Sequence, residues 1–392
     1  MRAGLLGRKL GHSLSPQIHR FFGDYEYRLY EKEPEEVEGF LRNGFAGGEF
    51  DFLNVTIPYK QTVFELCDEL SPMARKLGNV NFVMRTADGK LRGDNTDAFG
   101  VGRLLEANGI DVRGWNCAIL GAGGAAMTVK AVLEERGAKR VTFVRRGEEP
   151  AQDDDLIVNA TPVGMFPDVD GVRVNILQYV RCKAVLDLVY NPSPTRFVRE
   201  ALSCGKIAAD GMVMLIAQAY RASRLVPSAQ CLVPSAGRST LFLYGPPASG
   251  KSTWAKRIAA ATGWTPVDLD AEIVKAEGRS IPEIFEKEGE KGFRAIEKRC
   301  LWAVCGDRNV ATPTRSTGRV IALGGGALLD PESRKIAETA GRVVVLDCPI
   351  ETLKARLTGG DRPLSADTAK LEALVKSRAA HYASFPRHVK MI

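Results

Sequence analysis

The strongest chemical signal in the sequence is the segment GPPASGKST at 245–253. Gly245 is followed by four residues and then by Gly250, Lys251 and Ser252, with an apolar strand pattern before the segment and a helical pattern after it. In this arrangement consecutive backbone N–H groups cradle phosphates, the lysine reaches the β- and γ-phosphates, and the hydroxyl binds Mg²⁺. The segment therefore predicts a nucleotide-binding loop.

A second glycine turn, GAGGAA at 121–126, follows a buried strand pattern and precedes a helical one. Glycines there let N–H groups at a helix start approach a pyrophosphate, although Ala126 replaces the third glycine and a purely structural turn is an equal alternative. Arg145 and Arg146 end the next strand, where guanidinium groups would hold a ribose 2′-phosphate. Together they predict an NADP site, against the alternative of an ordinary basic strand end.

Short polar motifs in the first half could bind a carboxylate or move a proton. Ser13 and Ser15 in GHSLSPQIH offer two hydroxyls that either hold a carboxylate or cap a helix. Lys60 ends NVTIPYK, and Asp97 lies in GDNTDAFG. Taken singly, a lysine such as Lys60 is more often a solvated surface residue, and a segment such as NTD, which holds Asp97, is more often a helix cap.

The second half contains its own polar motifs. Asp268 and Asp270 lie two apart at the end of an expected strand, where one could face a metal ion and the other a hydroxyl, or where they could cap a helix. Glycines 324–326 join a strand to a helix and allow a ligand close to the backbone. Arg362 stands in a Gly- and Pro-bearing loop that could act as a lid, and Arg294 lies on a helical pattern where a surface role is the alternative.

These motifs lie in a chain of 392 residues, long enough for two or three domains. With 45% hydrophobic and 26% charged residues, the composition excludes a disordered, collagenous or coiled-coil protein. Residues 226–238 contain VPSA twice and lack an amphipathic period, so we expect a linker there. Strand and helix patterns alternate on both sides of it, which predicts parallel α/β domains.

The formal net charge of +7 is unevenly distributed. Residues 1–225 contain 29 basic and 29 acidic residues, whereas 226–392 contain 25 and 18, a local excess that suits a phosphate-rich small ligand better than a nucleic acid. The eight cysteines form no Cys-x-x-Cys motif, so we expect neither a zinc site nor a disulfide framework. No apolar run approaches the roughly 18 residues that cross a bilayer, so we expect a cytoplasmic protein without a membrane partner.

Taken in order, the motifs of the first half resemble shikimate dehydrogenase over nearly all of residues 1–225. The matching segments are GHSLSPQIH, NVTIPYK, LGNVN, GDNTDAFG, GAGGAA, NATPVGM, DLVYNP and DGMVMLIAQA. The resemblance implies that Lys60 delivers or accepts a proton as hydride moves, that Asp97 orients and tunes it, and that Ser13 and Ser15 hold the substrate carboxylate. The implied ligands of the substrate ring and its hydroxyls are Thr56, Asn81, Tyr190 and Gln218. The implied NADP contacts are Gly121, Ala122, Gly123, Gly124, Ala125, Arg145, Arg146, Leu188 and Gly211.

The first half departs from that family in three places. Arg145 and Arg146 stand where the family usually has Asn and then Arg, and Phe82 stands where it usually has Thr. Only RGEEPAQDDD separates the second cofactor strand from NATPVGM, which is too short for the helix and further strand of the family. We therefore expect a trimmed cofactor lobe, and its strictness for NADP over NAD stays open.

Residues 239 to about 385 resemble shikimate kinase. The matching segments are GPPASGKST, DLDAEI, SIPEIFEKEGEKGFRAIE, LGGGAL, RLTGGDRPL and RAAHY. The resemblance implies that Asp270 orients the 3-hydroxyl, that Asp268 assists Mg²⁺ through water beside Ser252, and that Arg362 closes over the γ-phosphate. The implied substrate contacts are Asp270, Arg294, Gly324, Gly325, Gly326 and Arg378. The implied ATP contacts are Gly245, Ala248, Ser249, Gly250, Lys251, Ser252, Thr253, Arg356 and Arg362.

The two resemblances fit together because shikimate is the product of the first family and the substrate of the second. We expect a substrate lobe at 1–98, a Rossmann-like NADP lobe at 99–210, a helix at about 211–225 that returns to the first lobe, and a kinase domain of the nucleoside-monophosphate-kinase type at 239–392. The expected function is reduction of 3-dehydroshikimate with NADPH, followed by phosphorylation of shikimate with MgATP. The alternatives are a quinate-type dehydrogenase fused to a kinase for another small hydroxy acid, and a nucleotide-sensing regulator with a degenerate dehydrogenase half. The oligomeric state is not readable from the sequence.

Overall fold

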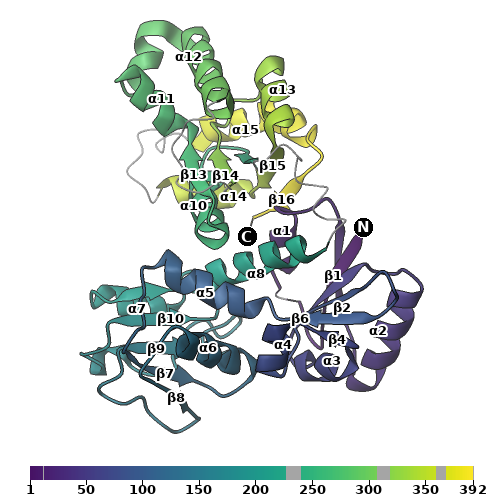
Figure 1. Ribbon diagram of the computed structural model, residues 1–392. Helices are drawn as coiled ribbons and strands as arrows, with labels where there is room; N and C mark the ends of the chain where they lie inside the picture. The colour runs from purple at the N-terminus through teal and green to yellow at the C-terminus, as the bar shows by residue number, and fades with distance from the viewer. Residues whose placement is uncertain (12, 227–239, 307–317, 359–367, 392) are drawn as a thin grey trace. The chain divides into compact units, whose positions relative to one another are not determined.

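The computed structural model describes residues 1–11, 13–226, 240–306, 318–358 and 368–391, so nearly all of the expected linker lies outside the described residues. Of the described residues, the first of two compact units holds 1–226 and 260–262, and the second holds 240–259 and those from 263 to 391. Three sheets with helices packed on them make up the two units, which confirms the predicted α/β class (Figure 1).

The first lobe of the first unit is a mixed six-stranded sheet in the order β2-β1-β3-β5-β6-β4. Its strands are β1 (Arg2–Gly7), β2 (Glu26–Glu31), β3 (Phe52–Val55), β4 (Glu69–Leu70), β5 (Phe82–Arg85) and β6 (Leu91–Asp94). Its helices are α1 (Ser15–His19), α2 (Val37–Ala46), α3 (Lys60–Leu66) and α4 (Pro72–Leu77), with a 3-10 turn η1 (Pro34–Glu36). All four side chains of β3 are buried, so this fixed strand delivers Thr56 and Lys60 to the rim of the sheet.

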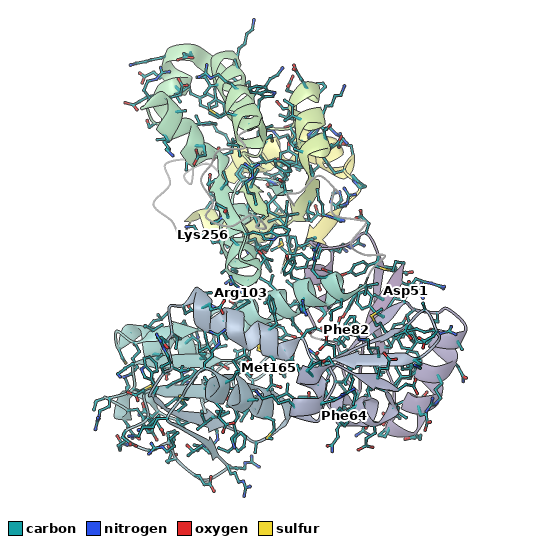
Figure 2. The ribbon with its side chains drawn as sticks, viewed as in Figure 1. Asp51, Phe64, Phe82, Arg103, Met165 and Lys256 are labelled. Carbon is teal, nitrogen blue, oxygen red and sulfur yellow. The ribbon has the colours of Figure 1, made fainter. Side chains whose placement is uncertain are left out.

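Phe82 belongs to the core of this lobe. It begins β5, where Figure 2 labels it, and is 1% exposed. Its ring centroid lies 5.5 Å from that of Phe52. Phe82 therefore adds apolar packing to the core, at a position where the family that the sequence resembles usually has Thr.

The second lobe is a parallel five-stranded sheet in the order β11-β10-β9-β7-β8. Its strands are β7 (Asn116–Leu120), β8 (Arg140–Val144), β9 (Leu156–Asn159), β10 (Ala184–Asp187) and β11 (Ile207–Ala209). Its helices are α5 (Asp97–Ala107), α6 (Gly124–Glu135), α7 (Arg196–Ser203) and α8 (Met212–Leu225), with a 3-10 turn η2 (Ile176–Gln178). Because α8 packs against both α5 and α1, it joins this lobe to the first one.

Residues 145–155, which connect β8 to β9, contain neither helix nor strand, which confirms the expected trimming. Ion pairs hold the end of this connection instead: the Arg140 guanidinium lies 2.6 Å from Asp153 Oδ1 and 3.0 Å from Asp154 Oδ1. The Asn116 side-chain amide also donates to Asp153 Oδ2 at 3.0 Å. These contacts fasten the short connection to the first residues of β7 and β8.

The second unit is a parallel five-stranded sheet in the order β13-β14-β12-β15-β16. Its strands are β12 (Thr240–Tyr244), β13 (Thr265–Asp268), β14 (Arg319–Ala322), β15 (Arg342–Asp347) and β16 (His388–Lys390). Its helices are α10 (Lys251–Thr262), α11 (Leu269–Glu277), α12 (Ile281–Gly306), α13 (Pro331–Ala340), α14 (Ile350–Thr358) and α15 (Thr368–Ala383).

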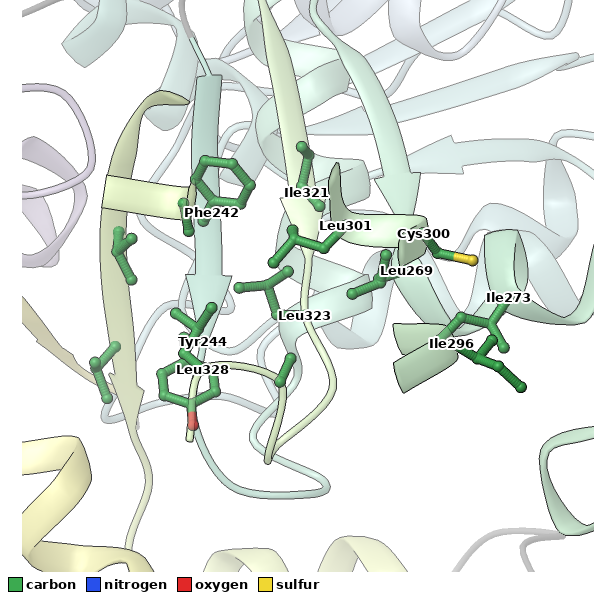
Figure 3. Close-up of a cluster of buried hydrophobic side chains, with 14 of the residues drawn as sticks. Phe242, Tyr244, Leu269, Ile273, Ile296, Cys300, Leu301, Ile321, Leu323 and Leu328 are labelled. Carbon is green, nitrogen blue, oxygen red and sulfur yellow. The ribbon is translucent and has the colours of Figure 1, made fainter. Parts of the chain in front are cut away.

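The core of the second unit lies between this sheet and its helices. Phe242, Tyr244 and Ile321 from the strands pack with Leu269 and Leu301 from the helices (Figure 3). The segments after β12 and β14 follow neighbouring parallel strands, and ligands of such sheets bind at the carboxyl ends of the strands. Within the described residues, no helix is long and apolar enough to span a membrane.

Candidate active sites

A cleft of about 830 Å³ opens between the two lobes of the first unit. From the predicted site it is lined by Thr56, Lys60, Asp97, Ala122, Gly123, Gly124, Ala125, Leu188, Tyr190, Gly211 and Gln218. The cleft therefore brings the expected proton-transfer residues and the expected cofactor turn together.

Lys60 and Asp97 form an ion pair at the side of this cleft. Lys60 begins α3 and Asp97 begins α5, and Lys60 Nζ lies 2.5 Å from Asp97 Oδ2. Both side chains are largely buried, with 17% and 5% of their surfaces exposed. The position of Asp97 in the first turn of a helix stabilises its negative charge. The pair presents an ammonium group whose orientation is fixed by a carboxylate.

Asn81 connects three elements behind this pair. Its side-chain amide donates to Thr96 Oγ1 and to Gln218 Oε1, both at 3.1 Å, and its Oδ1 accepts from the Thr96 N–H at 2.6 Å. Gln218 comes from α8, so this network holds α8 against the first lobe. Asn81 and Gln218 lie together although 137 residues separate them.

Ser13, Ser15 and Tyr190 form a group of hydroxyls near α1. The Ser13 hydroxyl donates to Ser15 Oγ at 3.1 Å, and Ser13 also hydrogen-bonds to Tyr190. Burial raises the pKa of Tyr190, so its hydroxyl stays neutral. Neutral hydroxyls of this kind can donate to a carboxylate.

Tyr27 adds a further hydroxyl to the group formed by Ser13, Ser15 and Tyr190, and the sequence analysis did not predict it as a site residue. Its hydroxyl donates to Asn54 Oδ1 at 3.0 Å and hydrogen-bonds to Ser15, and its ring stacks on His19 with centroids 4.1 Å apart. Tyr27 lies on β2, whose sequence EYRLYE shows no clear apolar alternation, so the sequence pattern carried little sign of its place.

The glycine turn after β7 leaves open space at the start of α6. Gly121 has φ +102°, and a Cβ built on it would lie 3.0 Å from Thr161 Cγ2, whereas Cβ atoms on Gly123 and Gly124 would meet nothing within 4 Å. Gly211 lies across the cleft, and a Cβ there would be 2.2 Å from Leu188 O. The N-terminus of α6 is therefore accessible, and its glycines have no side chains to keep a ligand away from the backbone N–H groups. Such a site suits the pyrophosphate of a dinucleotide.

Arg145 and Arg146 are exposed and follow β8 directly. The Gly121 N–H donates to Val144 O at 2.9 Å, which puts the two arginines beside the glycine turn. Within the described residues, neither guanidinium forms an ion pair with a carboxylate. Both charges are thus available to an anionic ligand at the turn.

The phosphate loop (245–253) of the second unit has the backbone that its sequence predicts. Gly245, Ala248 and Gly250 have φ values of +133°, +61° and +90°. Lys251 begins α10 and donates to Gly245 O at 2.9 Å and Pro246 O at 2.8 Å. Ser249 is buried beneath the loop, and Thr253 follows on α10.

Ser252 and Asp268 form the candidate metal site. The Ser252 hydroxyl donates to Asp268 Oδ2 at 2.6 Å, and Asp268 Oδ1 accepts from the Asp270 N–H at 3.1 Å. Hydroxyl and carboxylate oxygens are ligands that Mg²⁺ prefers, so the pair fits that ion. Asp268 ends β13 and caps α11, and Asp270 therefore lies in the first turn of that helix instead of at the strand end.

The triple-glycine turn (324–326) follows β14 and gathers the remaining charged residues. A Cβ on Gly324 would lie 3.3 Å from Asp270 Oδ1 and 2.7 Å from Glu297 Oε1, and a Cβ on Gly326 would lie 2.5 Å from Arg294 Nη2. Arg378 on α15 interacts electrostatically with Glu297. The predicted Asp270 and Arg294 thus lie beside this turn, and the predicted Arg378 interacts with Glu297 next to it.

Glu297 is a charged residue of this site that the sequence interpretation missed. It is 2% exposed, and its Oε2 accepts from Arg294 Nη1 at 2.5 Å, while Oε1 has no hydrogen-bond partner among the described residues. Burial raises the pKa of this carboxyl, and Arg294 opposes that shift. The i, i+3 spacing of Arg294 and Glu297 in GFRAIEKR was the available signal.

Two predicted nucleotide contacts remain. Arg356 Nη1 lies 3.4 Å from Ala248 O and 3.6 Å from Cys348 Sγ, which places the guanidinium beside the phosphate loop. Arg362 lies outside the described residues.

The two units define a two-lobed dinucleotide-type dehydrogenase followed by a phosphate-loop kinase fold. Residues 5–83 match the family model for the shikimate dehydrogenase substrate binding domain, and residues 247–391 match the model for shikimate kinase. The NADP⁺-type shikimate dehydrogenase of Clostridium beijerinckii is 37% identical over 245 residues, covering 57% of this chain and 90% of the relative. That of Methanopyrus kandleri is 38% identical over 258 residues, covering 57% and 88%.

Solved structures show the same likeness in the first unit. Shikimate dehydrogenase 1 of Peptoclostridium difficile has a TM-score of 0.52 and 32% identity, and covers 57% of this chain and 90% of its own. The Thermus thermophilus enzyme, solved with NADP(H) and shikimate, has a TM-score of 0.52 and 32% identity, covering 58% and 96%. The chain belongs to the shikimate dehydrogenase family, and its second unit carries a shikimate kinase domain.

Proposed function

We propose that the chain is a bifunctional enzyme of the shikimate pathway. Its first unit reduces 3-dehydroshikimate to shikimate with NADPH, and its second unit phosphorylates the 3-hydroxyl of shikimate with MgATP. The observation that carries the proposal is that one chain unites the Lys60–Asp97 cleft of a shikimate dehydrogenase with a shikimate kinase domain, so that the product of one unit is the substrate of the other. We assign the dehydrogenase to residues 1–225 and the kinase to 239–392, with 226–238 as the linker.

In the dehydrogenase, Lys60 delivers a proton to the substrate's C3 oxygen, and Asp97 holds the ammonium in place. NADPH supplies the hydride when it is bound. The hydroxyls of Ser13, Ser15 and Tyr190 hold the carboxylate, and the Asn81–Gln218 pair and Thr56 hold the ring. The supporting observation is a cleft with a volume of about 830 Å³, which is lined both by Lys60 and by the residues at the start of α6.

In the kinase, Asp270 orients the 3-hydroxyl and takes its proton, and Arg294 and Arg378 hold the carboxylate. The backbone of 324–326 meets the ring hydroxyls. Lys251 and the loop N–H groups hold the phosphates, and Ser252 and Asp268 hold Mg²⁺, which offsets phosphate charge when bound. Arg362 closes over the transferred phosphoryl group. The clustering of Asp270, Arg294 and Glu297 around the triple-glycine turn supports this arrangement.

The test uses the full chain with 3-dehydroshikimate, NADPH and MgATP, and mass spectrometry of shikimate and shikimate 3-phosphate. We expect the wild type to form the phosphate, Lys60→Met to form neither product, and Asp270→Asn to accumulate free shikimate. Lys60→Met supplied with shikimate should regain phosphorylation, which shows that the kinase unit is intact and that the block lies in the reduction step. If the wild type forms no shikimate from 3-dehydroshikimate, the dehydrogenase assignment is refuted. If it forms no shikimate 3-phosphate from added shikimate, the kinase assignment is refuted.

Both reactions use small-molecule substrates, and we place the enzyme in the cytoplasm, where NADPH and ATP are both supplied. Cell fractionation followed by the dehydrogenase assay tests this location.

A further inference from the structure

Tyr382 makes a single backbone contact that ties α15 to the triple-glycine turn. Its hydroxyl donates to Gly325 O at 2.7 Å across 57 residues of sequence. The side chain is 6% exposed and packs against Tyr244, with ring centroids 5.2 Å apart. A buried donor at 2.7 Å therefore holds the Gly325 carbonyl in one direction.

Fixing that carbonyl also fixes the N–H of Gly326. The two groups belong to one planar peptide, and in a trans peptide they point to opposite sides. The peptide is not among the cis bonds of the chain. Among the hydrogen bonds of the described residues, none is donated by the N–H of Gly325 or Gly326. The N–H groups of Gly325 and Gly326 are thus available as donors, and the Tyr382 contact fixes the orientation of the Gly326 N–H.

The other neighbours of the turn contact it by packing, whereas Tyr382 on α15 holds it through a hydrogen bond. A Cβ on Gly325 would lie 3.2 Å from Pro247 Cδ and 3.3 Å from Gly245 O, so the turn rests on the phosphate loop. Gly326 rests on the Arg294 guanidinium. These contacts limit translation of the turn, but glycine backbone can still rotate unless its carbonyl is held.

We propose that Tyr382 is a positioning residue of the kinase, which aims the Gly326 N–H at a ring hydroxyl of the acceptor by holding the Gly325 carbonyl. This inference rests on the proposed kinase function. Tyr382 acts through the peptide and does not itself touch the transferred group.

The test is Tyr382→Phe in the full chain, which removes the donor and keeps the ring packing. Because a buried carbonyl is left unpaired, we expect the kinase KM for shikimate to rise about tenfold. The KM for MgATP should change less than about twofold, a split that a general structural defect would not produce. The dehydrogenase rate of the same molecule reports its concentration, and the nearly unchanged KM for MgATP reports the folding of the kinase unit. Tyr244→Phe is the comparison variant, because it removes a hydroxyl from the same aromatic cluster whose backbone neighbour is Leu328 and not Gly325.

A second substrate separates the turn from Arg378, which also hydrogen-bonds to Tyr382. Shikimate methyl ester lacks the charged carboxylate that Arg378 is proposed to hold. If Tyr382 acts through the turn, the ratio of variant to wild-type KM is the same for the ester and for shikimate. A ratio near one for the ester, an unchanged KM for shikimate, or equal rises for shikimate and MgATP each overturns the inference. A wild type that phosphorylates neither substrate instead counts against the proposed kinase function.

Discussion

Lys60 Nζ and Asp97 Oδ2 lie 2.5 Å apart, although the two residues come from different helices and 37 positions separate them. Each residue is the first of its helix, so both side chains are held where rigid elements begin. The same cleft carries the open N-terminus of α6. The proposed proton donor and the proposed cofactor turn therefore line one cleft.

Replacing either member of this pair should remove dehydrogenase activity selectively. We expect Lys60→Met and Asp97→Asn to lower kcat/KM by about 10²- to 10⁴-fold, the usual contribution of general acid–base catalysis. NADPH oxidation measures the loss, and phosphorylation of added shikimate should stay at the wild-type rate. Lys76→Met is the matched control, because Lys76 forms an exposed ion pair with Glu135 at 2.8 Å. A loss in that variant equal to the loss in Lys60→Met would contradict the assignment.

Arg145 and Arg146 should set the preference for NADPH. In Arg145→Ser/Arg146→Ser we expect the KM for NADPH to rise tenfold or more, at about 1.5–3 kcal/mol for each hydrogen bond to a charged group. The KM for NADH should change little. Arg113→Ser offers the control, since Arg113 is exposed and paired with Asp111. Equal effects on both cofactors would show that the arginines serve the fold and not the 2′-phosphate.

Gly211 and Gly123 should respond differently to alanine. Gly211→Ala places a methyl group 2.2 Å from Leu188 O, so we expect overpacking of about 1–3 kcal/mol and a lower Tm. At Gly123 a Cβ meets nothing within 4 Å, so Gly123→Ala should keep its Tm while the KM for NADPH rises. Thermal unfolding with and without NADP⁺ distinguishes the two effects. Equal Tm losses would mean that the glycine turn is required by packing alone.

Ser252→Ala should raise the Mg²⁺ requirement of the kinase. The variant removes the hydroxyl that lies 2.6 Å from Asp268 Oδ2 and leaves the rest of the phosphate loop in place. We expect the Mg²⁺ concentration for half-maximal rate to rise several-fold at fixed ATP, with dehydrogenase activity unchanged. An unaltered Mg²⁺ titration would exclude Ser252 as a ligand.

His19 should make the first unit sensitive to acid. Burial lowers the pKa of His19 from 6.5 to about 3, so its imidazole is neutral when folded and gains a proton on unfolding. Stability is therefore full above pH 6.5 and falls as the pH drops towards 3, by about 2 kcal/mol between pH 7 and pH 5. The urea midpoint for loss of dehydrogenase activity measures this, and His19→Gln should show a smaller shift. Equal shifts in both proteins would assign the acid sensitivity to other groups.

The sequence predicted the parts of this molecule whose chemistry is local. The phosphate loop, the glycine turn and the helix from Asp97 are set by short-range spacing and turn residues, and the structure gives each its expected element. The short 145–155 connection could likewise be read as too brief for a helix and a strand. Asp270 was misplaced by one element, because Asp268 both ends β13 and caps α11.

Contacts between distant segments could not be predicted in the same way. Tyr382 reaches Gly325 across 57 residues, and Tyr27 reaches Asn54 across 27. Neither tyrosine stands in a motif that marks it as polar-bonded, and only the three-dimensional packing shows that their hydroxyls meet polar partners. Glu297 was missed for a similar reason, since its burial depends on how α12 packs beneath the triple-glycine turn.

The short connection after β8 also alters how the first unit meets its surroundings. β8 ends its sheet, and within the described residues no strand pairs with its outer edge. An uncovered edge of this kind can recruit a strand from another molecule, and charged side chains are a common defence against such pairing. Lys139 and Arg140 stand at one end of β8, and Arg145 and Arg146 at the other. Arg140 is paired with Asp153 and Asp154, so the unpaired charges that the structure describes beside this edge are mainly those of Arg145 and Arg146. Salt screens such charges, and the arginines that we propose for the cofactor site would then also protect an open strand edge at low ionic strength.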